Sequence, residues 1–316
     1  MWHFPRQNLV CLVFRGLGPK LLGVFPGGRF EQFIPSRPLT TKEIGLPRLK
    51  HVARRVGQLL ARIHALDVPV AKRPTLTDVA ESYLCKLRKL NRRMIHKMKG
   101  NMVKANASLC PKEINCDVLA TELDIMKQCL AKSGSPVVFS HNDLQELNIL
   151  LHEKYTLDSK GNLNATDDET PFALIDFEYS SYNYRGFDFA NFLCEHMIDY
   201  SNKKPPYYTI DRGSLPAETQ QRLLINAYLD EIEKVARNEQ DDSCKENKER
   251  IREAHVRELL TESRRFLAVS HLYWSIWSFE LAEESPIEFD YVSYGIDRLV
   301  LYYIHKQDLL EFLQKH

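Results

Sequence analysis

The sequence lacks a net charge of one sign. Its 43 basic and 42 acidic side chains leave a formal charge of +1 over 316 residues. Without a general excess of positive charge, binding to nucleic acid or to an anionic membrane surface has no electrostatic support from the chain as a whole. We therefore expect no nucleic-acid partner.

Paired cysteines and long apolar runs are also missing. The seven cysteines are an odd number and show no C-x-x-C spacing, which argues against a disulfide framework and a structural zinc site. The longest apolar run near the start, residues 9–14, is too short to span a membrane and is not followed by the small-residue cleavage site of a signal peptide. These absences predict a soluble, cytoplasmic protein with reduced thiols and no membrane span.

What is present is enough apolar sequence for a large core, since 44% of the residues are hydrophobic. Short apolar runs separated by glycine and proline predict strands at residues 8–14, 21–25 and 29–34, with a hairpin turn at Pro26-Gly27-Gly28. Further strands are expected at 137–140, 148–151 and 172–176.

The rest of the chain has helical periodicity. Apolar residues recur at three- and four-residue steps along residues 52–66 and again along 119–130, where Asp117 is the expected N-cap. The C-terminal part repeats this pattern, first at Ile225, Leu229, Ile232 and Val235 and then at Leu259, Leu260, Phe266 and Leu267. The polar residues 158–171 predict a surface loop, and the charged residues 238–250 predict a solvated linker.

Three polar residues bracket the predicted strands near the middle of the chain. Asp143 and Asn148 form the pattern D-x-x-x-x-N, and Asp176 ends the strand after the next loop. Protein kinases use this layout, because phosphoryl transfer needs Mg²⁺ held against the nucleotide phosphates and an acceptor hydroxyl aligned with the γ-phosphate. Asn148 and Asp176 suit the metal, and Asp143 suits the role of base.

These residues could instead be ordinary turn formers between strands, as aspartate and asparagine often are. A single Asp-Asn pair would favour that interpretation. The full set, at this spacing and between two apolar runs, favours catalysis.

The sequence resembles the choline and ethanolamine kinases. The resemblance lies in "VVFSHNDLQELNILL" and "LIDFEYSSYNYRGFDFANFLCEHMIDY", and extends to "RGLGPKLLGVF", "RFEQFIPSRPL" and "SHLYWSIWSFELAEESPIEFDYVSYGIDRL". It implies an α+β, protein-kinase-like fold of two lobes, with a mostly helical C-terminal lobe. It also implies Asp143 as the catalytic base, Asn148 and Asp176 as Mg²⁺ ligands, ATP as co-substrate, and a hinge that contacts adenine through Glu31, Gln32, Phe33 and Ile34.

A substrate pocket can be expected from the aromatic residues of these motifs. Choline carries a quaternary ammonium without N–H donors, so proteins bind it with aromatic faces and a nearby carboxylate. By resemblance, the cage consists of Tyr179, Tyr200, Trp274, Trp277 and Tyr294, with Glu195 as its acidic member. The alternative is that these rings are ordinary core residues, since Trp274 and Trp277 lie three apart on a predicted helix.

The sequence also departs from the family pattern. Leu147 stands where a glycine is usual, so a positive φ at that position would strain the backbone. Phe192, Ala190 and His196 replace a usual His, Gly and Trp. Gln145-Glu146 and "FEYSSYNYRGFD" look more like the choline branch than the ethanolamine branch.

The region before the expected hinge is short for a kinase. A glycine-rich loop, a basic strand residue and its glutamate partner normally precede the hinge, and we find none of them before Glu31. We therefore expect an N-terminal β lobe that is largely missing, with residues 1–34 as its remnant and 35–316 as the catalytic and substrate-binding lobe.

The predicted function is ATP- and Mg²⁺-dependent phosphorylation of choline, with ethanolamine as a further substrate, in the first step of phospholipid head-group synthesis. One alternative is a truncated, non-catalytic relative that pairs with a full-length kinase, since family members are commonly dimers. Another is a phosphotransferase for a different cationic hydroxyl compound, such as an aminoglycoside, which the aromatic set disfavours.

Overall fold

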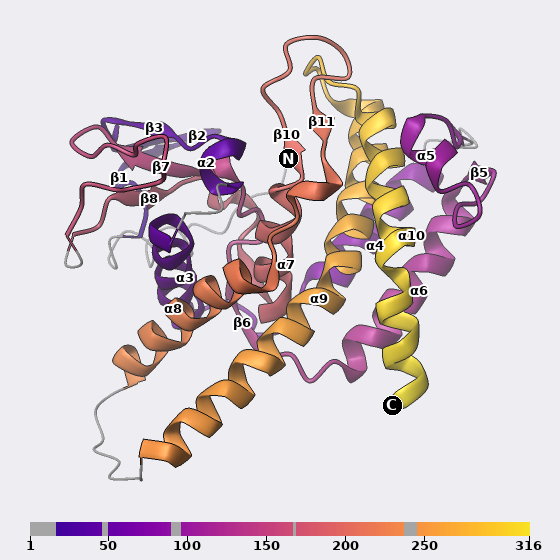
Figure 1. The fold of residues 1–316 in the computed structure, drawn as a ribbon. Coiled ribbons are helices and arrows are strands. Elements are labelled where there is room, and N and C mark those ends of the chain that lie inside the picture. Colours follow the sequence, from indigo (N-terminus) through magenta and orange to yellow (C-terminus); the bar gives the residue numbers. More distant parts are fainter. Residues whose placement is uncertain (1–16, 46–49, 90–95, 167–168, 237–244) are drawn as a thin grey trace.

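The computed structural model describes residues 17–45, 50–89, 96–166, 169–236 and 245–316. Figure 1 shows the strands of residues 21–38 and 149–174 on one side of the molecule and a group of long helices on the other. The α+β class and the mostly helical C-terminal part are as predicted. The boundary between 1–34 and 35–316, and the loss of most of an N-terminal lobe, are not tested by the structure and remain predictions.

The described chain begins with a β-hairpin. Strand β1 (Leu21–Phe25) pairs with β2 (Gly28–Glu31) in antiparallel register. Gly27 has φ of 86°, a conformation that glycine adopts without steric cost, so the expected hairpin turn is confirmed. The strand predicted at 8–14 lies outside the described residues.

Two small sheets carry the polar motifs. In the first, β7 (Ile149–His152) lies between β3 (Ser36–Pro38) and β8 (Phe172–Leu174), and both pairings are antiparallel. In the second, β6 (Val137–Ser140) pairs with β9 (Ser181–Tyr184). The strands expected near 137–140, 148–151 and 172–176 are thus confirmed, and the motifs lie at their ends.

Helices α3 (Lys50–His64) and α8 (Glu218–Ala236) pack on each other beside the first sheet (Figure 1). The predicted apolar face of α3 is buried at Val52, Val56, Leu59 and Ile63. On α8 the prediction fails at Val235, which lies in the last turn of the helix and is 57% exposed.

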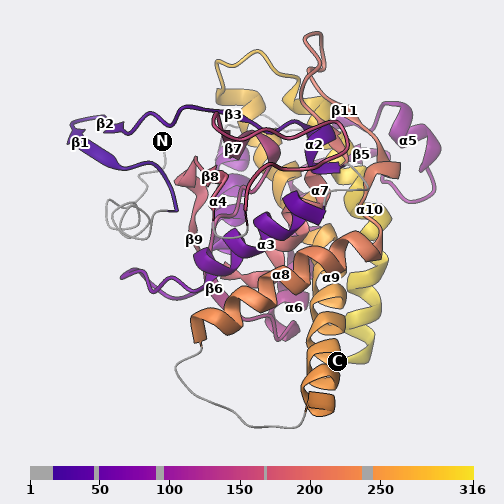
Figure 2. The same cartoon turned by 60° about the vertical axis from the view of Figure 1, so that its left-hand side comes forward.

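A 40-residue helix, α9 (Lys245–Glu284), organises the larger core. It packs against α10 (Tyr291–Lys315) and α7 (Arg185–Glu195), and Figure 2 shows α9 and α10 running side by side. The remaining elements are α2 (Thr41–Gly45), α4 (Leu76–Lys89), α5 (Asn101–Ala105), α6 (Cys116–Lys132), β4 (His96–Lys97), β5 (Glu113–Ile114), β10 (Ile198–Asp199), β11 (Thr209–Ile210) and the 3₁₀ turns η1 (Glu146–Asn148), η2 (Phe177–Tyr179) and η3 (Arg212–Ser214).

Three local predictions are corrected. The N-cap of α6 is Asn115, whose side chain accepts from the N–H groups of Asp117 and Val118, so Asp117 lies inside the helix. The loop 158–171 is not wholly on the surface, because Leu163 bridges to Leu157 and is buried in the core around α3. Of the expected linker 238–250, residues 238–244 lie outside the description and the rest form the start of α9.

No helix in the part of the chain that the structure describes is both long enough and apolar enough to cross a bilayer.

Candidate active site

The first sheet brings Asn148 and Asp176 together. Strand β7 starts directly after Asn148, and β8 ends two residues before Asp176. Ile149 pairs with Leu174, and the N–H of Ile175 donates to the carbonyl oxygen of Asn148 over 3.1 Å. The two expected metal ligands therefore occupy neighbouring positions although 28 residues separate them in the chain.

Asn148 also holds the expected base. Its Nδ2 donates to Oδ2 and to the backbone oxygen of Asp143, both over 2.9 Å. An amide NH₂ has two donors, so both face Asp143, and Oδ1 is the polar atom of the side chain that remains for a cation. The turn η1 sets this geometry by folding the chain back between the two residues.

Left-handed backbone conformations mark both ends of the site. Asn142 has φ of 67° and Asp176 has φ of 61°, values that cost free energy for residues with a side chain. At Asn142 the side chain fixes the conformation, since Nδ2 donates to the Tyr179 carbonyl and to Ser181 Oγ, and Oδ1 accepts from Asn183, each over 2.8 Å. A strained backbone conformation that several hydrogen bonds hold in place is typical of active sites and ligand-binding sites.

The strain expected at Leu147 is absent. The described non-glycine residues with positive φ are Asn142, Asp176 and Tyr207. Leu147 lies within the 3₁₀ turn η1, which has negative φ values compatible with any L-residue. Its side chain is 43% exposed, so leucine fits there.

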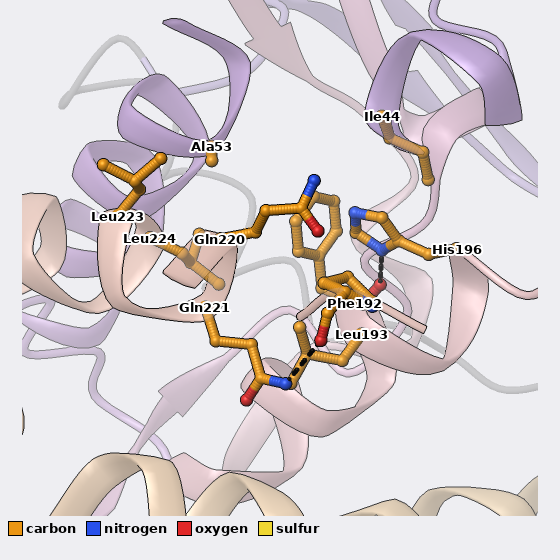
Figure 3. Close-up of a pocket in the computed structure, with 10 residues that line it drawn as sticks. Ile44, Ala53, Phe192, Leu193, His196, Gln220, Gln221, Leu223 and Leu224 are labelled. Carbon is orange, nitrogen blue, oxygen red and sulfur yellow. Dashed lines mark hydrogen bonds between the residues drawn. The ribbon is translucent and has the colours of Figure 1, made fainter. Parts of the chain in front are cut away.

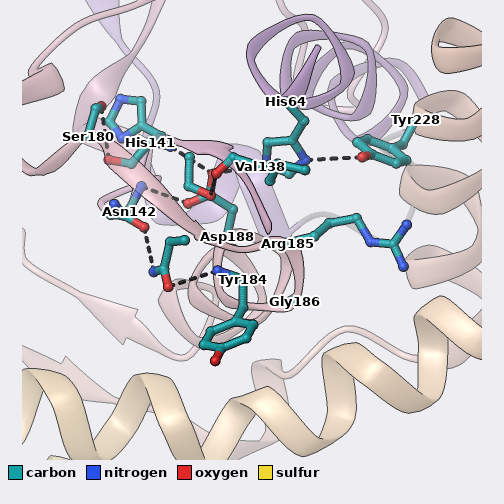
Figure 4. A network of polar contacts seen from close by, with 12 residues as sticks. His64, Val138, His141, Asn142, Ser180, Tyr184, Arg185, Gly186, Asp188 and Tyr228 are labelled. Carbon is teal, nitrogen blue, oxygen red and sulfur yellow. Dashed lines mark hydrogen bonds and ion pairs between the residues drawn. The ribbon is translucent and has the colours of Figure 1, made fainter. Parts of the chain in front are cut away.

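A buried carboxylate supports the loop from behind (Figure 4). Asp188, on α7, accepts from the backbone N–H of His141 over 2.8 Å and from that of Asn142 over 2.7 Å. His64 of α3 contacts the same carboxylate over 3.1 Å, and its other ring nitrogen contacts the hydroxyl of Tyr228 on α8 over 3.1 Å. Three helices are thereby connected to the residues before Asp143.

The site gathers negative charge. Burial raises the pKa of Asp143 well above its usual value, and the charges of Glu195 and Asp176 add to this shift. Burial and the Asp176 charge also raise the pKa of Glu178, a carboxylate that the sequence analysis did not select. Crowded carboxylates of this kind favour the binding of a cation.

The donor set fits a kinase-type Mg²⁺ site. Among the described residues, no group of three or more His, Cys, Asp or Glu side chains forms a metal cage. Mg²⁺ in kinases does not need one, because one or two protein oxygens and the nucleotide phosphates share the ion. Asn148 Oδ1 and the Asp176 carboxylate are oxygen donors of the required type.

The expected cage residues form two groups. In the first, the ring of Tyr179 lies 5.5 Å from that of Trp274, and the two tryptophans lie 5.1 Å apart, measured between centroids. Trp277 Nε1 donates to the hydroxyl of Tyr179 over 3.1 Å. This group joins η2, next to Asp176, to helix α9.

The second group surrounds Glu195 at the end of α7. The hydroxyl of Tyr200 donates to Glu195 Oε2 over 2.9 Å and lies 2.8 Å from the hydroxyl of Tyr294. Ring contacts from Trp277 to Tyr291, on to Phe289 and then to Tyr294 connect the two groups, with centroids 5.0–5.9 Å apart. All six expected substrate residues thus belong to one continuous cluster.

The core interpretation of these aromatics also has support. Trp274 and Tyr294 are 5% and 4% exposed and belong to the larger core, whereas Tyr179, Tyr200 and Trp277 are half-buried at its edge. The cluster therefore combines packing with a partly open aromatic surface, and its role in substrate binding remains a prediction.

Comparison with known proteins identifies the family. A sequence profile described as choline/ethanolamine kinase matches residues 6–303. The chain belongs to the choline/ethanolamine kinase family. It is 36% identical to choline kinase A2 of Caenorhabditis elegans over 338 aligned positions, which cover 99% of this chain and 72% of that protein. It is also 36% identical to a choline/ethanolamine kinase of Rattus norvegicus over 303 positions, covering 96% and 68%.

Solved structures of this family share the fold. A choline kinase of Cryptosporidium parvum matches with a TM-score of 0.66 and 22% identity, covering 98% of this chain and 80% of the other. An ethanolamine kinase of Plasmodium vivax matches with a TM-score of 0.67 and 21% identity, covering 96% and 73%. The predicted family, its phosphotransferase class and the protein-kinase-like fold are confirmed.

The expected hinge of this family member connects the β1–β2 hairpin to the sheet of β3, β7 and β8. Glu31 ends β2 and its carboxylate binds Arg29, while the N–H of Gln32 donates to the Lys20 carbonyl over 2.7 Å. Phe33 is 84% exposed, and the carbonyl of Ile34 accepts from Ser36 Oγ. The geometry places these residues between β2 and β3, and contact with adenine remains a prediction.

Several site residues escaped the sequence analysis of this kinase. Asp188 and His64 support the loop, and Arg298 is ion-paired with Glu195. Glu146 is 2% exposed and accepts from Thr41 Oγ1 over 2.8 Å; burial, with the charge of Glu195, raises its pKa to about 8. Of these residues, only Arg298 could have been selected from the sequence, because it lies one helical turn after Tyr294, an expected substrate residue.

A separate pocket lies between α2, α3, α7 and α8 (Figure 3). Its lining includes Ile44, Phe192, His196, Gln220 and Leu224, and none of the described residues that line it is an expected site residue. Two of the family departures, Phe192 and His196, thus face this pocket.

Proposed function

We propose that this protein transfers the γ-phosphoryl group of ATP to the hydroxyl of choline, and accepts ethanolamine as a second substrate. Family membership supports phosphorylation of choline or ethanolamine. The product would be the phosphorylated head group that enters phosphatidylcholine or phosphatidylethanolamine synthesis in the cytoplasm.

One observation carries the proposal. Asn148 donates to Asp143 through its amide and lies beside Asp176 through the Ile175 hydrogen bond. Folding alone does not require these three polar side chains at one sheet end. Phosphoryl transfer does, because it depends on positioning and charge stabilisation.

Each residue has a defined task in this proposal. The Asp143 carboxylate receives the proton of the substrate hydroxyl, with Oδ2 held by Asn148 and Oδ1 available. Asn148 and Asp176 would hold Mg²⁺, which offsets the negative charge of the phosphates. Residues 31–34 would contact the adenine of ATP.

The aromatic cluster supports choline as the acceptor. A quaternary ammonium is attracted to the faces of tryptophan and tyrosine within about 6 Å. Tyr179 lies three residues after Asp176 and its ring contacts that of Trp274, which in turn contacts Trp277. Glu195 lies close enough to Asp143 to raise its pKa. A cation in this cluster would place its hydroxyl arm toward Asp143.

The test is direct. Purified protein is mixed with ATP, Mg²⁺ and choline, and phosphocholine is measured by ³¹P NMR. We expect product from the wild type, almost none from Asp143→Ala, and normal product from Asp117→Ala, an exposed control on α6. Wild-type protein that makes no product from choline or ethanolamine would overturn the proposal and favour a non-catalytic relative. Unchanged turnover in Asp143→Ala would sink the assignment of the base.

A further inference from the structure

Arg298 lies fully buried behind the aromatic cluster. It is a residue of α10 with 0% exposure, and its Nη2 donates to Ser270 Oγ on α9 over 3.1 Å. Its buried Nε has no hydrogen-bond partner among the described residues. An unsatisfied buried donor costs free energy, so packing alone does not explain an arginine here.

The partner of Arg298 is the acidic member of the expected cage. Nη1 of Arg298 donates to Glu195 Oε1 over 3.0 Å, and the Tyr200 hydroxyl donates to Oε2 over 2.9 Å. Both carboxylate oxygens are thus engaged by the protein, and the negative charge of Glu195 is offset by a cation. A substrate therefore meets a carboxylate with little unpaired charge.

The other polar atoms of the cluster are also engaged internally. Trp274 Nε1 donates to Asn191 Oδ1 over 2.7 Å, and Trp277 Nε1 donates to Tyr179. The hydroxyls of Tyr200 and Tyr294 bond to each other. The cluster consequently offers ring faces but few free hydrogen-bond acceptors.

This arrangement should bind a primary ammonium less favourably than a quaternary ammonium. A primary ammonium has three N–H donors, and leaving them unpaired on desolvation costs free energy. A quaternary ammonium has none and interacts well with aromatic faces.

We propose that Arg298 is a specificity-determining residue: by pairing with Glu195 it makes the cage select a quaternary ammonium over a primary one. The proposal rests on the proposed function and goes beyond it by assigning the selectivity to an ion pair between α7 and α10.

The first test changes the ion pair from one side. In Arg298→Met, Glu195 becomes free to accept from an ammonium N–H. A hydrogen bond from the ammonium to the charged carboxylate strengthens the binding of ethanolamine alone, so the ratio of kcat/KM for choline to kcat/KM for ethanolamine should fall about tenfold or more. An unchanged ratio in a folded Arg298→Met protein overturns the proposal.

A single change leaves a buried charge unpaired, which can destabilise the fold. The second test therefore compares a single variant with a double variant that removes both charges. Glu195→Gln alone leaves Arg298 to repel the substrate cation, so choline affinity should fall strongly. The double variant Glu195→Gln/Arg298→Met removes both charges and should recover at least tenfold in choline affinity relative to Glu195→Gln. A double variant that binds choline no better than Glu195→Gln would show that the Glu195 charge itself holds choline, and the proposal would fail.

Choline binding is followed by the fluorescence of Trp274 and Trp277, which needs no turnover. The matched control is Arg185→Met/Glu262→Gln, a pair of a half-buried arginine and a buried glutamate, with 2.6 Å between the charged atoms and located between α7 and α9. It should lower thermal stability and leave the choline-to-ethanolamine ratio unchanged. Failure of the proposed function is recognised separately, by wild-type protein that makes neither phosphorylated product.

Discussion

The side-chain amide of Asn148 donates to Oδ2 of Asp143 over 2.9 Å, so one residue orients the expected base and keeps Oδ1 for the proposed metal. Asn148→Ala removes both contributions. We expect kcat to fall by about two orders of magnitude or more, and half-maximal activity to require more Mg²⁺. Initial rates measured against Mg²⁺ concentration at saturating choline check this. Asn162→Ala, in an exposed loop, is the control, and an unaltered Mg²⁺ requirement in Asn148→Ala would contradict the metal role.

Asp188 should affect turnover without touching substrate. In Asp188→Asn, the single amide oxygen cannot accept from both the His141 and Asn142 N–H groups, so one buried donor loses its partner. We expect the free energy of unfolding to fall by about 1–3 kcal/mol, and kcat to fall while KM for choline stays near the wild-type value. Urea denaturation and steady-state kinetics measure the two effects. A loss of stability with normal kcat would make Asp188 purely structural; Asp211→Asn, at the N-cap of η3, is the control.

The tryptophans should act on choline rather than on ATP. A desolvated cation–π contact contributes about 2 kcal/mol, so Trp277→Ala should raise KM for choline roughly thirtyfold and change KM for ATP little. Trp274→Ala should act in the same direction, with an added loss of stability because Trp274 is buried. Phe312→Ala, near the far end of α10, is the control. Equal changes in both KM values would indicate a general packing defect.

Acid should destabilise the fold through His196. Burial lowers the pKa of His196 from 6.5 to about 4. Between these values the unfolded chain binds a proton that the folded chain does not, so stability is lost as pH falls from 6.5 toward 4, by on the order of 3 kcal/mol in total. His196→Gln should lose about 2 kcal/mol less than wild type between pH 7.5 and 5, as measured by urea unfolding. His316→Gln, at the exposed C-terminus, should behave as wild type, and identical pH slopes for His196→Gln and wild type would refute the assignment.

The candidate site residues Asp143 and Asn148 could be selected from the sequence because their pattern is local. Asp143 and Asn148 lie five residues apart, and the strands on either side have clear apolar runs. Residues 153–171 separate β7 from β8, so the pairing of these two strands does not follow from a short hairpin turn. Residues that belong to a local pattern could therefore be selected as candidates, and their catalytic roles remain predictions.

The supporting residues could not be predicted because their partners are distant. Asp188 accepts from a backbone group 47 residues earlier, and Arg298 donates to a residue 103 positions away. Such contacts exist only after α7, α9 and α10 have packed. The error at the N-cap of α6 has a local cause. Asn115 and Asp117 are both residue types that favour the N-cap, and the structure shows the extended N-cap backbone at Asn115.

The pairing of β3 with β7 has a consequence for how this sequence can change in length. Pro38 lies opposite Leu150, Arg37 opposite Leu151 and Ser36 opposite His152, so these two segments are held to each other residue by residue. Inserting or deleting one residue in either segment would turn alternate side chains to the wrong face and would move the hinge residues relative to Asn148. The connection between β7 and β8 has no such restriction around the exposed residues 158–160. Variation in length among relatives should therefore concentrate there and avoid the paired strands.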